Sequence, residues 1–126
     1  MWRILTATIV SLLCVACSDG ISTYEEGIEA QTTLMTEMVN ILQRVTDQRS
    51  ADEATAKIEA LGEQLAVVTA QMEKFPEPTV SEMQQIDARQ REQREELQDN
   101  ALAQMKKLDQ YDSLHKAWTR ALAEMR

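Results

Sequence analysis

Residues with obvious chemical reactivity are few in this chain. Its 126 residues include two cysteines and one histidine, and its three glycines do not form a glycine-rich phosphate-binding loop. The carboxylates between residues 25 and 29 and between residues 92 and 96 have the helical spacing of solvated faces. Paired catalytic carboxylates need a cleft, and a simple small bundle offers little of one. The sequence therefore predicts a protein without enzymatic activity.

Methionine supplies the soft ligands of this sequence, with seven residues in all. Met35 and Met38 lie one helical turn apart, and thioethers suit Cu(I) in an extracytoplasmic space. Further ligands of a copper site would come from later helices: Met72, Met83, Met105 or His115. Met35 and Met38 also fall on an apolar helical stripe, where methionine fills irregular gaps in a core. Core packing is the favoured interpretation, and copper is the alternative.

A methionine on the first helix and a histidine near the end of the last is a known haem-ligand layout. It is that of the soluble periplasmic four-helix cytochromes of type b, and Met35 or Met38 with His115 is similar to it. The resemblance implies a haem held between the first and last helices. Because the final helix is short and His115 stands between Leu114 and Lys116, we favour a histidine at the edge of the bundle and expect no cofactor.

Cys17 has the most informative surroundings of any reactive residue. A cationic start with Arg3 leads into an apolar run from Ile4 to Val15, and Ala16 stands directly before Cys17. This run is shorter than the roughly 20 residues that a membrane-spanning helix needs, so residues 1–16 are predicted to be a cleaved signal peptide. The segment resembles the lipobox of bacterial lipoprotein precursors, although Cys14 occupies a position where leucine is commonest.

The resemblance to lipoprotein precursors implies a cellular location for the protein. Cys17 would become the first residue of the mature chain, carry acyl chains such as palmitate, and anchor the protein to a bacterial membrane, facing the periplasm. Ser18 is similar to the residue found in lipoproteins passed on to the outer membrane, which we favour over the inner membrane. Cys14 would leave with the signal peptide, so the mature chain would hold no disulfide. The expected partners are the membrane and another envelope protein or a second copy of this chain.

The charge of the chain excludes one class of partner. The net charge is −8, and removal of residues 1–16 takes away Arg3 and no acid, which leaves −9. A chain this acidic is a poor ligand for nucleic acid, and none is predicted. Abundant Ala, Glu, Gln, Met and Leu, with few aromatic residues, favour helices over sheets.

Capping signals and apolar periodicity divide the mature chain. Ser22, Ser50 and Thr79 are each followed three residues later by Glu, as in a capping box, and Pro76 and Pro78 interrupt any helix between the last two. The pattern predicts helices at about residues 23–46, 51–74, 80–109 and 113–125. The predicted domains are the signal peptide at 1–16, a lipidated tether at 17–22 and a helical bundle at 23–126.

The predicted architecture is all-α. Two helices of similar length joined by a short connection form an antiparallel hairpin, the third helix is expected to pack along the second, and the last closes one end. The result is an up-down bundle of three to four helices, with an extended helical hairpin or coiled coil as the alternative. The cadence of residues 35–47, 54–61 and 75–78 resembles small helical secreted or lipid-anchored bacterial proteins of unknown function. We therefore expect a membrane-anchored periplasmic lipoprotein that serves as a structural or protein-interaction module.

Overall fold

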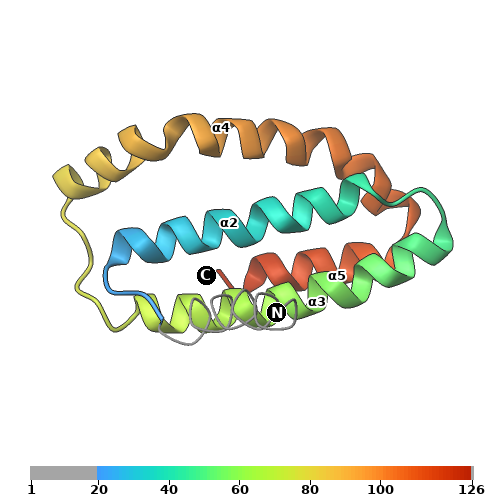
Figure 1. Ribbon diagram of the computed structural model, residues 1–126, viewed down its shortest axis with the longest axis horizontal. Helices are drawn as coiled ribbons and strands as arrows, with labels where there is room; N and C mark the ends of the chain where they lie inside the picture. The colour runs from blue at the N-terminus through green and yellow to red at the C-terminus, as the bar shows by residue number, and fades with distance from the viewer. Residues whose placement is uncertain (1–19, 126) are drawn as a thin grey trace, which may run out of the picture.

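The computed structural model describes residues 20–125 of the chain (Figure 1). The predicted signal peptide, Cys17 and most of the tether lie outside the described residues. Within them there are helices and no strands, in the order α2 (Tyr24–Gln43), α3 (Gln48–Met72), α4 (Val80–Gln110) and α5 (Asp112–Ala123). The prediction of an all-α antiparallel bundle is confirmed, with four helices. In residues 20–125 none of the helices combines the length and apolar character needed to cross a membrane.

The first three helices each begin after a residue whose side chain caps the helix, but for two of them the capping residue differs from the one predicted. Thr79 caps α4 as predicted, since its hydroxyl accepts from the backbone N–H of Glu82. The cap of α2 is Thr23 rather than Ser22, and it accepts from the N–H of Glu26. The cap of α3 is Asp47, and Ser50, predicted as the cap, lies inside the first turn.

Asp47 explains why α3 begins earlier than predicted. Its carboxylate accepts the backbone N–H of Ser50 at 2.8 Å, while the Ser50 hydroxyl accepts the N–H of Asp47 at 3.0 Å. This reciprocal capping box satisfies two donors that a helix start leaves unpaired. The hydrogen bonds from the backbone and side chain of Ser50 lower the pKa of Asp47 below its usual value, because they favour the charged carboxylate.

Helix neighbours differ from the prediction in one respect. The third helix was expected to pack along the second, but α4 packs against α2, and it makes no comparable contact with α3 within residues 20–125. The C-terminal helix α5 packs along α3 and also touches α4. The four helices therefore form a ring in which α2 and α3, α3 and α5, α5 and α4, and α4 and α2 are neighbours. Figure 1 shows α4 and α2 running side by side.

The core lies where all four helices overlap. Its fully buried side chains come from α2, α3 and α5: Met38, Val39, Leu42, Ile58, Leu65 and Leu114. Along α3 the buried positions Ala54, Ile58, Leu61 and Leu65 alternate spacings of four and three, which places them on one face. By contrast α4 buries only Ile86, Gln90 and Leu108 among its 31 residues.

Polar contacts fix α4 on α2 at two points. Arg89 donates to Glu25 at 2.7 Å, and this hydrogen bond raises the pKa of Arg89 above its usual value. At the other end, the Lys107 ammonium donates to the carbonyls of Leu42 and Gln43 at 2.9 and 3.0 Å. Lys107 thus caps the C-terminus of α2 from another helix, where a positive charge is favourable.

Candidate functional site

An open apolar groove runs along the bundle beside the end of α5. It holds about 820 Å³, which is within the range of about 300–1,000 Å³ typical of ligand pockets. Its apolar side chains come from all four helices and from the segments that follow α3 and α5: Tyr24, Ile28, Met35, Met72, Phe75, Met83, Leu97, Ala101, Met105, Trp118, Leu122 and Met125. We call this surface the apolar groove.

The groove exists because α5 is short. Four-helix packing needs four helices along the whole bundle, but α5 has 12 residues while α3 has 25 and α4 has 31. Where α5 is present, its Leu114 and Trp118 are buried in the core. Beyond the end of α5 the faces of α2, α3 and α4 that would meet a fourth helix remain open. The apolar residues there are half-buried rather than buried, as at Tyr24, Ile28 and Phe75.

Polar side chains border the groove. Gln31 on α2 donates to the hydroxyl of Thr69 on α3 at 3.2 Å, and this bond ties the floor of the groove together. Arg94 on α4 pairs with Asp87 at 2.5 Å, which compensates its charge locally. Glu73 and Glu77 border the end that α5 leaves open, and neither has a cation within 4.0 Å among the described residues.

Trp118 is the aromatic side chain at the junction of core and groove. It is 3 % exposed, and its indole Nε1 has no hydrogen-bond partner within the described part of the chain. Trp118 belongs to the hydrophobic core and also forms one edge of the groove. Its fluorescence is therefore a direct probe of groove occupancy.

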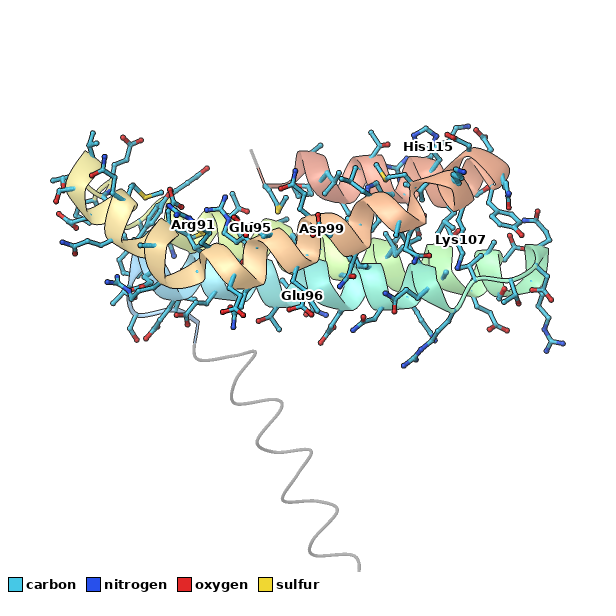
Figure 2. All side chains as sticks on the ribbon, turned by 90° about the horizontal axis from the view of Figure 1, so that it is seen from above. Arg91, Glu95, Glu96, Asp99, Lys107 and His115 are labelled. Atoms are coloured by element: carbon cyan, nitrogen blue, oxygen red, sulfur yellow. The ribbon has the colours of Figure 1, made fainter. Side chains whose placement is uncertain are left out.

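The structure separates the predicted metal and haem ligands. Met35 lines the groove, but Met38 points into the core with no exposed surface. His115 is exposed, outside the set of groove residues, and Figure 2 shows it on the outer side of α5. Met72, Met83 and Met105 line the same groove as Met35, but Met83 and Met105 lie about 33 Å apart along α4, so the four thioethers do not converge on one point. Among residues 20–125 no group of three or more His, Cys, Asp or Glu has the arrangement of a metal site.

Sequence reasoning missed the groove as a unit and several of its residues. In the sequence, Tyr24, Phe75 and Leu97 look the same as core residues, because groove positions and core positions are both apolar and fall on the same helical stripe. Glu73 and Glu77 read as ordinary surface acids. The available signal was length: an apolar stripe of about 24 residues on each of the first two helices faces a last helix half as long.

Comparisons with known proteins add no relative. No protein-family model, curated protein or solved structure matches this chain.

Proposed function

We propose that this protein is a membrane-anchored envelope lipoprotein whose helical bundle serves as a non-enzymatic protein-interaction module. The observation that supports the interaction role is the apolar groove, which is open to solvent, has a volume of about 820 Å³ and is lined by side chains of a kind that is normally buried. A groove of this volume, lined mostly by apolar side chains, is in the size range of ligand-binding pockets. The anchor is supported by the sequence around Cys17, which has the order of a lipobox.

Anchoring at Cys17 would hold the groove near the membrane. Cys17 precedes Gly20 by three residues, which span at most about 11 Å when extended. The backbone of Gly20 lies against the side chain of Gln71, at the same end of the bundle as Met72 and the open end of the groove. In this proposal the groove meets partners that lie close to the membrane surface, on the periplasmic side of the outer membrane.

The anchor is tested by Cys17→Ala in the full chain. We expect the wild-type protein in the membrane fraction, with acyl chains detected on the mature N-terminus by mass spectrometry. The Cys17→Ala variant should move to the soluble fraction, because the acyl chains and not the bundle provide membrane affinity. Cys14→Ala is the matched control and should stay in the membrane fraction. Membrane retention of Cys17→Ala would contradict the anchor.

A copper-binding role is the second candidate, favoured by the four thioethers that share the groove. Soft sulfur ligands suit Cu(I), and one ion would use Met35 on α2 and Met72 on α3 with at most one of Met83 and Met105, which lie about 33 Å apart along α4. Competition with a chromogenic Cu(I) chelator tests it. If copper binds there, Met35→Leu and Met72→Leu lower the affinity while Met38→Leu, in the core, leaves it unchanged. Equal chelator competition by all three variants and the wild type would remove this candidate.

A further inference from the structure

The unfilled part of the groove has the dimensions of a short helix. α5 approaches α3 closely where Ala121 lies against Gly62, since a Cβ on Gly62 would lie 3.1 Å from the Cβ of Ala121. From Gly62, α3 continues for ten residues to Met72, or about 15 Å at 1.5 Å per residue. α5 runs in the same direction as α3 and continues past Ala121 to Ala123, so about eight residues of α3, or about 12 Å, have no fourth helix beside them. A fourth helix of about two turns, in line with α5, would complete the bundle.

The lining of this space is adaptable. Met35, Met72, Met83, Met105 and Met125 all border the groove, which is five of the seven methionines of the chain. Methionine side chains are flexible and polarizable, and they suit surfaces that repack around the apolar face of a helix. Met105 is 42 % exposed and borders the groove from α4 at the level of α5.

The charges at the open end select the occupant. Glu73 and Glu77 border the groove without a cation within 4.0 Å in residues 20–125, whereas the nearby Arg94 is already paired with Asp87. The chain from residue 17 onward carries a charge of −9. A basic partner is attracted by this field and an acidic partner is repelled. A fatty-acid carboxylate at this end would be repelled as well.

From this geometry we propose that the groove binds one basic amphipathic helix of a partner protein. The helix lies in line with α5, sets its apolar face on Ile28, Met72 and Leu97, and brings Lys or Arg side chains to Glu73 and Glu77. This mode is the insertion of an amphipathic helix into a hydrophobic groove, with anchors spaced by three and four residues. The inference rests on the proposed function, because it names the class of partner that the interaction module takes.

A fluorescence titration tests the proposal on the full chain carrying Trp2→Phe, which leaves Trp118 as its sole tryptophan. The probe is a synthetic tryptophan-free helical peptide of about four turns, with leucines on one face and lysines on the other. A peptide with the same leucines and glutamates in place of the lysines is its control. We expect the basic peptide to change Trp118 emission with saturation at one peptide per chain, and the acidic peptide to bind at least about tenfold more weakly.

Variants locate the binding site. Ala101→Phe fills the groove from α4 and should weaken the basic peptide by about tenfold or more, while Ala103→Phe, on an exposed position of the same helix, should leave binding unchanged. Replacement of Glu73 and Glu77 by Gln should weaken binding about threefold to tenfold and reduce its salt dependence. Circular dichroism of each variant checks that the helices are retained.

Three outcomes would overturn the proposal. The first is equal binding of the acidic and basic peptides. The second is equal binding of the basic peptide by the Ala101→Phe and Ala103→Phe variants. The third is that neither peptide binds while the fluorescent fatty acid parinarate binds in the groove. The last outcome would identify an acyl-chain site instead. The proposed function is tested separately by crosslinking the protein to its partners in intact cells. If Ala101→Phe abolishes the crosslink, Ala103→Phe keeps it and no peptide binds, the interaction module is retained and only the basic helix is rejected.

Discussion

Gln90 is the polar residue of α4 whose burial has no visible compensation. It is 5 % exposed, and both its amide nitrogen and its amide oxygen lack hydrogen-bond partners within the described part of the chain. An unsatisfied buried polar group costs about 1–3 kcal/mol. Gln90→Met keeps the length and shape of the side chain and removes both polar atoms, so we expect the free energy of unfolding to rise by about 1–2 kcal/mol.

Urea denaturation of the full chain measures this effect. Gln84→Met is the matched control, because Gln84 is exposed on the same helix and its replacement should change stability by less than about 0.5 kcal/mol. A loss of stability in Gln90→Met would mean that the Gln90 amide is satisfied by water in solution, and the residue would then be structural.

Lys107 is the residue whose removal should uncouple α4 from α2. Its ammonium donates to two carbonyls at the C-terminus of α2, where the helix has no basic residue in its own last turn. Lys107→Met retains the aliphatic stem and loses the charge and the donors, so we expect a loss of about 1–2 kcal/mol in unfolding free energy. Lys106→Met is the control, since Lys106 is exposed; equal effects of the two substitutions would refute the capping role.

At the scale of helices, the sequence predicts faces and some boundaries but not neighbours. Thr79 and the two prolines before it specify the start of α4 locally, and that start is confirmed. The start of α3 was misplaced because Ser50 and Asp47 both suit a cap, and only their reciprocal hydrogen bonds decide between them. Periodicity marks a buried stripe without naming what covers it, so the packing of α4 on α2 was not foreseen.

The candidate site was less predictable than the fold for a related reason. Met35, Met72, Met83 and Met105 were named as candidate thioether ligands from different helices, and all four border the groove, although Met83 and Met105 lie far apart along α4. The groove itself depends on how far α5 extends along α3, which is a property of the packed bundle. For His115 the favoured interpretation was a position at the edge of the bundle, with pairing to Met35 or Met38 as the alternative, and its side chain is exposed and lies outside the groove.

Gly62 is the position that sets how closely α5 packs on α3. A Cβ there would lie 3.1 Å from the Cβ and 3.2 Å from the Cα of Ala121, so a larger side chain must push the two helices apart. We expect Gly62→Leu to destabilise the bundle by about 1–3 kcal/mol, although leucine is the better helix former. Ala60→Leu, exposed on the same helix, is the control. Comparable urea midpoints for the two variants would contradict the close approach of α3 and α5.

At the scale of the whole molecule, the helices differ in how much they contribute to the core: α3 and α5 are well buried, and α4, which we call the loose side, is not. α3 buries seven of its 25 residues and α5 buries four of 12, whereas α4 buries three of 31. The middle of α4 is covered by exposed charges, and Figure 2 shows Arg91, Glu95, Glu96 and Asp99 along it. Local stability follows the density of buried contacts, so α4 should open more readily than its neighbours.

Native-state hydrogen exchange checks this distribution of stability. We expect backbone amides between residues 80 and 97 to exchange at least about tenfold faster than those between residues 51 and 65, because their helix rests on α2 through few buried side chains. The α5 amides should be protected like those of α3, despite the shortness of that helix, since its buried residues lie in the core. Adding the basic peptide should then slow exchange in the α4 segment, because the peptide supplies the neighbour that α4 lacks beyond the end of α5. Uniform protection of α3 and α4 in the free protein would contradict the loose side, and peptide binding without slower exchange in α4 would place the peptide outside the groove.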